Sequence, residues 1–246
     1  MNPIKNYIHG KIVSNSTNTL DVVNPATGEI INSVHMSNDK DFEHAIKSSK
    51  KAQIEWQNVT PLKRSRILAE YKKILKDNID SLAEIISQEH GKTIEDSKGS
   101  IIRGIEVVEF SCGIPHLLKG EYSQDVGTEI DSWSIRQPLG ICAGITPFNF
   151  PAMVPMWMFP LSIACGNSFI LKPSEKNPSC SIKLAELFTE AGLPDGILNV
   201  LQGDKFIVDK LLSSKDISAV SFVGSTPVAK YIYETSAKYG KRVQSL

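Results

Sequence analysis

From Gly140 onwards, short apolar segments alternate regularly with helical segments, and no other feature of the sequence constrains the fold as strongly. The predicted strands are 140–145, 168–171, 198–201, 219–223 and 242–246, and the predicted helices are 153–165, 179–191, 205–212 and 226–239. Short apolar strands joined by helices form parallel sheets with right-handed crossovers and helices on both faces. The expected fold class is therefore α/β, with a doubly wound parallel sheet whose ligands bind at the carboxyl ends of the strands.

The residues before Gly140 predict small hairpins and a group of helices. A turn with the sequence Asn-Pro-Ala-Thr-Gly-Glu separates two short strand candidates, 22–23 and 30–34. Apolar spacing predicts helices over 39–57 and 96–118. Between them, one helix is expected to begin at Thr60-Pro61, and another to end at His90 with Gly91 as its C-terminal cap. Segment 132–136 alternates polar and apolar residues, which indicates a half-exposed strand of a hairpin.

Charge and composition exclude several classes of function. The 246 residues include 27 Lys and Arg and 27 Asp and Glu, so we expect neither nucleic acid nor an anionic membrane as a partner. The longest apolar run, 153–165, is interrupted by prolines and is too short to span a bilayer. Because no export or organelle signal is recognisable, the expected location is the cytoplasm.

Cysteine and histidine spacing gives no indication of a metal site. No Cys-x-x-Cys pair and no His-Glu-x-x-His cluster occurs, so we expect no bound metal. The scattered cysteines are interpreted as small packing residues: Cys112, Cys142, Cys165 and Cys180.

The first candidate motif, Ile-Thr-Pro-Phe-Asn-Phe-Pro at 145–151, directly follows the strand 140–145. Two prolines restrict the backbone on either side of Asn149, whose side-chain NH₂ could donate a hydrogen bond to a developing oxyanion. Taken in isolation, Asn149 is better interpreted as an Asx turn or a helix cap.

The second candidate motif, Leu-Lys-Pro-Ser-Glu at 171–175, follows the next strand. Lys172 and Glu175 at the end of a parallel strand could bind the hydroxyls of a ribose. A carboxylate there would repel a 2′-phosphate and so favour NAD over NADP. The alternative is an ordinary solvated Lys–Glu pair.

The third candidate motif, Ser-Phe-Val-Gly-Ser-Thr at 221–226, leads from a strand into a helix. Gly224 allows close backbone approach, and Ser225 adds a hydroxyl beside the free N–H groups of a helix N-terminus. This combination suits a phosphate group. The alternative is a routine strand-to-helix turn, because the full Gly-x-Gly-x-x-Gly spacing is missing.

Together, in this order and each at a strand end, the three motifs resemble those of the aldehyde dehydrogenase superfamily, and the resemblance covers nearly the whole chain. It implies a Rossmann-like NAD-binding domain, with Asn149 stabilising a thiohemiacetal oxyanion. Lys172 and Glu175 would hold the adenosine ribose, and Gly224 and Ser225 would lie by the pyrophosphate. The full set of cofactor-binding positions implied is Ile145, Thr146, Pro147, Phe148, Lys172, Ser174, Glu175, Gly224 and Ser225.

Three segments, at 103–109, 146–160 and 224–233, are similar to the methylmalonate-semialdehyde dehydrogenase branch of that family. Members of this branch oxidise malonate or methylmalonate semialdehyde with NAD and coenzyme A to acetyl-CoA or propionyl-CoA. Arg103 matches an arginine that binds the substrate carboxylate. A surface ion pair with Glu106 or Glu109 is an equally acceptable role for Arg103.

The resemblance also implies a domain organisation. Residues 1–120 and 138–246 would form the NAD-binding domain, and 121–137 would be part of an oligomerisation hairpin, so we expect a homo-oligomer, either a dimer or a tetramer. The catalytic domain would be absent, because none of the four cysteines matches the nucleophile motif of the family. We therefore expect this chain to be the amino-terminal half of such a dehydrogenase and inactive alone.

Two other functions stay open at this point. The chain could belong to another aldehyde dehydrogenase branch that releases a free acid instead of a CoA ester. It could also be a non-catalytic fragment that binds a nucleotide or forms oligomers.

Overall fold

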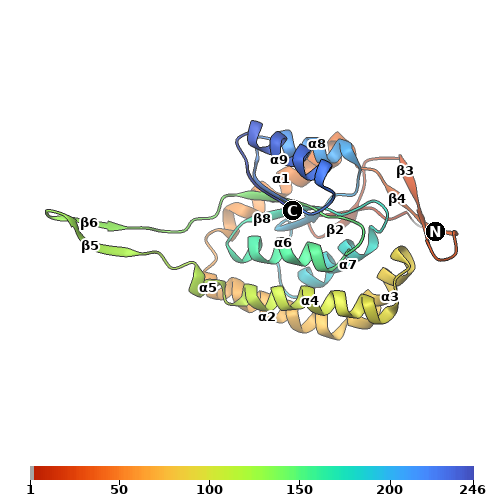
Figure 1. The fold of residues 1–246 in the computed structure, drawn as a ribbon, viewed down its shortest axis with the longest axis horizontal. Helices are drawn as coiled ribbons and strands as arrows, with labels where there is room; N and C mark the ends of the chain where they lie inside the picture. Colours follow the sequence, from red (N-terminus) through yellow and green to blue (C-terminus); the bar gives the residue numbers. More distant parts are fainter. Residues whose placement is uncertain (1–2) are drawn as a thin grey trace.

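The computed structural model describes residues 3–246 and has a seven-stranded sheet at its centre (Figure 1). The strand order is β11-β10-β7-β8-β9-β1-β2. The five strands predicted from the sequence are present and mutually parallel: β7 (Ile141–Ile145), β8 (Ser168–Lys172), β9 (Leu198–Val200), β10 (Ile217–Phe222) and β11 (Arg242–Ser245). The α/β fold class is thereby confirmed.

The sheet also has an antiparallel edge that the sequence analysis did not include. There β1 (Asn6–Ile8) pairs antiparallel with both β9 and β2 (Lys11–Val13). Each of these strands has three residues, which is too few to show a periodic pattern. A long-range contact fixes this edge, because the carboxamide oxygen of Asn6 accepts the backbone N–H of Gln202 at 2.8 Å.

Helices cover both faces of the sheet, as Figure 1 shows. Ile141, Ala143 and Ile145 of β7 pack with α1 (Asp39–Trp56), α8 (Lys205–Ser213) and α9 (Thr226–Lys238). Cys142 of β7 faces the other side, as the two-residue period of a strand requires. The helices on that side are α2 (Pro61–Asp77), α3 (Ile79–His90), α4 (Ile94–Cys112), α6 (Met153–Ala164) and α7 (Ser179–Glu190). Among residues 3–246, no helix is long and apolar enough to cross a membrane.

Local capping explains several helix boundaries. Thr60 and Thr93 accept backbone N–H groups of the first turns of α2 and α4, and Gly91 ends α3 with a φ of 81°. The single helix predicted over 96–118 is wrong, because the segment divides into α4 and α5 (Ile114–Leu117) at Gly113. Pro115 has no N–H to continue the helical hydrogen bonding, which favours a break between α4 and α5.

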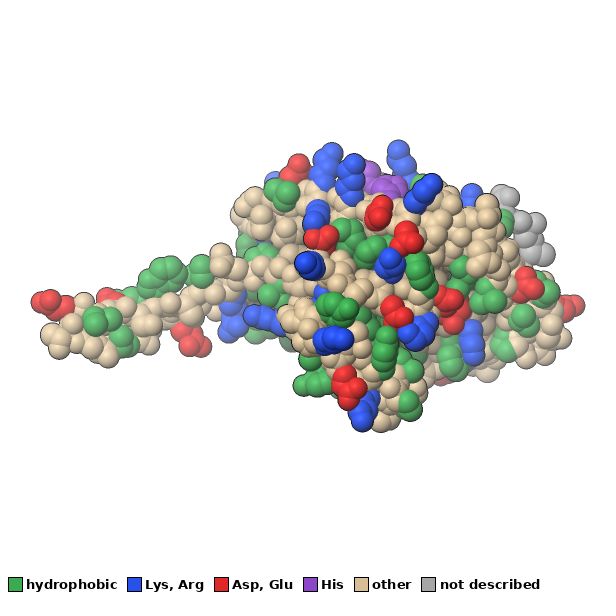
Figure 2. Space-filling model, turned by 90° about the horizontal axis from the view of Figure 1, so that it is seen from above, with side chains coloured by type: hydrophobic (Ala, Val, Ile, Leu, Met, Phe, Trp, Pro, Cys, Tyr) green, Lys and Arg blue, Asp and Glu red, His purple; other side chains and the backbone are tan. Residues whose placement is uncertain are grey.

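Two hairpins lie outside the central sheet. The strands β3 (Thr19–Val23) and β4 (Ile30–His35) pair antiparallel around the predicted turn. The strands β5 (Tyr122–Gly127) and β6 (Ile130–Trp133) form an arm that projects from the body (Figures 1 and 2). The predicted strand 132–136 therefore ends early, at Trp133. The arm exposes large apolar side chains: Tyr122, Val126, Ile130, Trp133 and Ile135.

Lys241, directly before β11, is a buried lysine whose partners are backbone carbonyls. Its ammonium donates to the carbonyl oxygens of Ser214, at the end of α8, and of Ile217, the latter at 2.7 Å. Burial lowers the pKa of Lys241. This ammonium joins β11 to the start of β10 and also lies favourably at a helix C-terminus.

We expect Lys241→Met to lower the free energy of unfolding by about 1–3 kcal/mol, because two buried carbonyls lose a charged donor while the aliphatic stem is kept. Urea denaturation monitored by circular dichroism measures this loss. Lys238→Met, at an exposed lysine in the last turn of α9, is the control and should change stability little. Equal stability of the two variants would contradict the assignment.

Candidate functional site

The carboxyl ends of β7, β8 and β10 border a cleft of about 600 Å³. All nine cofactor positions expected from the sequence line it: Ile145, Thr146, Pro147, Phe148, Lys172, Ser174, Glu175, Gly224 and Ser225. Sequence analysis missed Asp204 and Lys205, at the start of α8, and Tyr231 of α9, which also line the cleft. Asp204 could have been recognised from the sequence as a helix-capping residue that follows a predicted strand. In the structure its carboxylate caps α8 by accepting the N–H of Phe206.

Strand register brings the three loops to one level. Ile145 is paired with Lys172 on one side and with Phe222 on the other. Hydrogen bonds continue beyond the strands, from the N–H of Thr146 to the carbonyl of Lys172 at 3.1 Å and from Val223 to Ile145 at 3.3 Å. The segments that follow each strand therefore begin side by side.

Lys172 and Glu175 form an ion pair with a distance of 2.9 Å between Nζ and Oε2. Only 5% of Lys172 is exposed, so the pair differs from the ordinary solvated pair that the sequence alone allowed. A buried ammonium is costly without a counter-charge. Glu175 supplies that charge and is half-buried at the cleft, where a carboxylate can accept hydrogen bonds from hydroxyl groups.

Gly224 and Ser225 lie at the start of α9. A Cβ atom on Gly224 would come within 2.3 Å of the ring of Phe222, so a larger residue here would have to displace that ring. Ser225 precedes the helix and its hydroxyl caps no backbone N–H. The exposed helix start with a free hydroxyl is compatible with a phosphate group.

Asn149 is exposed and does not line the cleft. In the described part of the chain its side chain makes no hydrogen bond, and Ala152 stands at the cap position of α6. The cap interpretation therefore has no support, and the amide is available to an external group. The loop containing Asn149 also contains Pro147 and Phe148, which do line the cleft.

Arg103 is exposed on α4 and lies outside the set of residues that line the cleft. Of its two proposed partners, Glu109 pairs instead with Lys72 at 3.1 Å. Within residues 3–246, Arg103 makes no ion pair. Its neighbour Gly104 packs against Met156 of α6, the helix that follows the Asn149 loop.

The cysteines are poorly suited to nucleophilic chemistry. Burial raises the pKa of Cys112, Cys142, Cys165 and Cys180 above the ordinary thiol value, which disfavours the thiolate. The described residues contain no group of three or more Cys, His, Asp or Glu side chains arranged to hold a metal ion.

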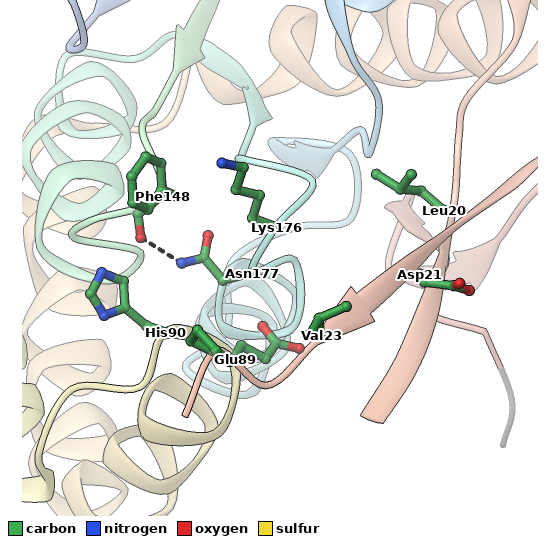
Figure 3. A pocket seen from close by; sticks show the side chains of 9 residues that line it. Leu20, Asp21, Val23, Glu89, His90, Phe148, Lys176 and Asn177 are labelled. Carbon is green, nitrogen blue, oxygen red and sulfur yellow. Dashed lines mark hydrogen bonds between the residues drawn. The ribbon is translucent and has the colours of Figure 1, made fainter. Parts of the chain in front are cut away.

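A second pocket, of about 450 Å³, adjoins the cleft and shares Phe148 with it (Figure 3). Glu89 of α3 lines this pocket and is only 7% exposed. Its Oε2 accepts the backbone N–H of Ser179, the first residue of α7, at 3.1 Å. Burial raises the pKa of Glu89 to about 7. Sequence analysis missed this residue, because Ser179 lies 90 positions away.

The fold and the cleft define an α/β domain with a nucleotide-sized site at the carboxyl edge of its parallel strands. The chain belongs to the aldehyde dehydrogenase family, whose family model matches residues 12–246. The family resemblance seen in the sequence is thereby confirmed.

Individual relatives agree with this assignment. The chain is 52% identical to a malonate-semialdehyde dehydrogenase of Pseudomonas aeruginosa, over 100% of this chain and 50% of that protein. It is 48% identical to the mitochondrial acylating methylmalonate-semialdehyde dehydrogenase of Arabidopsis thaliana, over 98% of this chain and 40% of the relative. The chain thus spans about half the length of the curated relatives it matches, or less.

Solved structures are similar over the same extent. A putative methylmalonate-semialdehyde dehydrogenase from Sinorhizobium meliloti, complexed with NAD, superposes with a TM-score of 0.97 at 55% identity, over 99% of this chain and 50% of that one. The methylmalonate-semialdehyde dehydrogenase of Oceanimonas doudoroffii gives a TM-score of 0.98 at 51% identity, over 100% and 50% of the two chains.

The raised pKa of Glu89 predicts how stability depends on pH. The folded state binds the proton on the Glu89 carboxyl more tightly than the unfolded chain does. The contribution of this proton to the free energy of unfolding is therefore complete below pH 4.5 and is lost as the pH rises through about 7. Glu89→Gln keeps an oxygen for the Ser179 N–H and removes the buried charge. We expect it to be more stable than the parent by about 1–3 kcal/mol at pH 8 and nearly equal at pH 5.

Urea unfolding at pH 5, 6, 7 and 8 measures this difference. Glu84→Gln, on the exposed face of the same helix, is the matched control and should follow the parent at every pH. Parallel pH profiles for the parent and Glu89→Gln would refute the burial argument.

Proposed function

We propose that this chain is the NAD-binding half of a dehydrogenase that oxidises malonate or methylmalonate semialdehyde. The observation that carries the proposal is the single cleft that all nine expected cofactor positions line, with the Lys172–Glu175 ion pair already formed at its wall. The family membership and the names of the relatives support the same reaction class.

The cleft residues fit a dinucleotide. Glu175 would accept hydrogen bonds from the adenosine ribose, and the start of α9 at Gly224 and Ser225 would bind the pyrophosphate. Thr146 also lines the cleft, and its buried hydroxyl has no hydrogen-bond partner in the described chain. NAD, when bound, supplies the acceptor for the hydride that leaves the aldehyde carbon.

Asn149 and Arg103 would act on the substrate. The free side-chain NH₂ of Asn149 would donate to the oxygen that becomes negatively charged when a thiol attacks the aldehyde. Arg103 would pair with the carboxylate of the semialdehyde. The attacking cysteine and the coenzyme A site would be contributed by residues outside this chain, since all four thiols here have raised pKa values.

A homo-oligomer, a dimer or a tetramer, is proposed through the hairpin 121–137. A two-stranded hairpin has no core of its own. Exposed side chains such as Tyr122 and Trp133 would be covered by a second copy of the chain. The division into an NAD-binding domain, at 1–120 and 138–246, and this hairpin is part of the same proposal.

The ribose assignment predicts a change in nucleotide preference. We expect Glu175→Gln to raise the Kd for NAD about tenfold or more, because ribose hydroxyls lose a charged acceptor, and to narrow the discrimination against NADP. Isothermal titration calorimetry with both nucleotides measures the effect. Glu186→Gln on the exposed part of α7 serves as the control, and unchanged affinity for both nucleotides in Glu175→Gln would overturn the assignment.

The oxyanion assignment predicts a kinetic effect. In a dehydrogenase that combines these residues with a cysteine nucleophile, Asn149→Ala should lower kcat by ~10²–10³ with little change in NAD binding. The measurement is NADH formation at saturating aldehyde, with and without coenzyme A. Formation of NADH independent of coenzyme A would favour a free-acid branch, and a near-parental rate in Asn149→Ala would remove the assigned role.

A further inference from the structure

We propose that Asn177 is a positioning residue that holds the loop after β7 against the loop after β8 and so fixes the wall of the nucleotide cleft. This inference rests on the proposed NAD site. The side chain of Asn177 lines the adjoining pocket instead of the cleft, so it acts through its neighbours and not by touching the nucleotide.

The bond that carries the inference joins Asn177 to Phe148. The Nδ2 atom of Asn177 donates to the carbonyl oxygen of Phe148, 29 positions away, as the dashed line in Figure 3 shows. Within residues 3–246, it is the one hydrogen bond recorded for the backbone of 147–149. Without it, the nearest backbone hydrogen bonds on either side of 147–149 in the described chain would be those of Thr146 and of the Phe150 carbonyl.

Asn177 itself is held from several sides. Its backbone N–H donates to the carbonyl of Ser174 at 3.4 Å, and the next residue but one, Ser179, donates its N–H to Glu89 at 3.1 Å. Gln202 donates to the carbonyl of Pro178 at 3.3 Å. The donor is therefore mounted on a rigid segment, as positioning another loop requires.

The ring of Phe148 is held separately from its backbone. The ammonium of Lys176 lies 4.8 Å from the ring centroid, and the imidazole of His90 stacks at a centroid distance of 6.1 Å. Phe148 borders the cleft on one side and the second pocket on the other. A displacement of its backbone would therefore change the shape of the cleft and move the following residue, Asn149.

Stability alone does not account for an asparagine at this place. Asn177 is 2% exposed, and its Oδ1 is buried with no hydrogen-bond partner in the described chain. A buried oxygen without a partner costs about 1–3 kcal/mol. Leucine has nearly the same size and shape and would avoid this cost, so the feature that asparagine adds is the donor to Phe148.

The test separates affinity from stability with two matched variants of the 246-residue chain. Asn177→Leu removes the donor and also the unpartnered oxygen. Asn167→Leu removes the buried amide that binds Leu139, Gly140 and Ser162 at the amino ends of the parallel strands, away from the cleft. For each chain, calorimetry gives the Kd for NAD, urea denaturation gives stability, and amide hydrogen exchange follows peptides that cover 145–151.

We expect Asn177→Leu to raise the Kd for NAD about three- to tenfold and to accelerate exchange in 145–151, with little loss of stability. Asn167→Leu should lose more stability and keep the parental Kd. Parental NAD affinity in Asn177→Leu, or a loss of affinity that tracks stability in both variants, would overturn the positioning role. A parental chain that binds no NAD would overturn the proposed function itself, and the inference with it.

Discussion

The architecture depends on the pairing of β7 with a parallel strand on each side. Ile145 is paired with both Lys172 and Phe222, so the three strands end at one level and their loops meet. Every residue of β7 and β8 is buried, and alternate side chains pack into the two helical layers. A shift of one residue would exchange the two faces. The same packing that stabilises the sheet thus aligns the loops that form the cleft.

Three buried titratable side chains contribute to this arrangement, and each has a defined partner: two are lysines, and the third is the carboxyl of Glu89, whose pKa burial raises. Lys172 pairs with Glu175 at the cleft, Lys241 binds carbonyls at the end of α8, and Glu89 accepts the first N–H of α7. Each of these side chains holds two elements or loops in a defined relative position, which non-directional apolar packing specifies less closely. A buried charge without a partner is destabilising. Displacement of one of these elements would separate a buried group from its partner and lower the stability of the fold. Electrostatics therefore helps to specify the positions of the cleft loops.

The sequence predicts most of the second half of the fold, because its signals are local. The strand β7 is a continuous apolar run directly after Gly140, and β8 has an apolar centre at 169–171 and ends directly before Pro173. The three cleft motifs follow strands directly. The features that were missed depend on distant partners. Asn6 is fixed by Gln202, and Glu89 acquires its environment from Ser179. The break at Gly113 is different, since Pro115 was visible in the sequence and was outweighed by helical spacing on both sides.

The loop after β7 contains both residues of the cleft wall and the candidate substrate-contacting residue Asn149. The sequence showed only that these residues are close together along the chain. Pro147 and Phe148 form part of the cleft wall, whereas Asn149, the next residue, leaves its amide free outside that wall. Both sets of residues therefore share one short backbone, which Asn177 holds through the Phe148 carbonyl. On the proposed positioning role, the contact that shapes the cleft would also set the position of Asn149. Under the proposed function, the geometry of this loop would therefore link the wall of the cofactor cleft to the side chain proposed to act on the substrate.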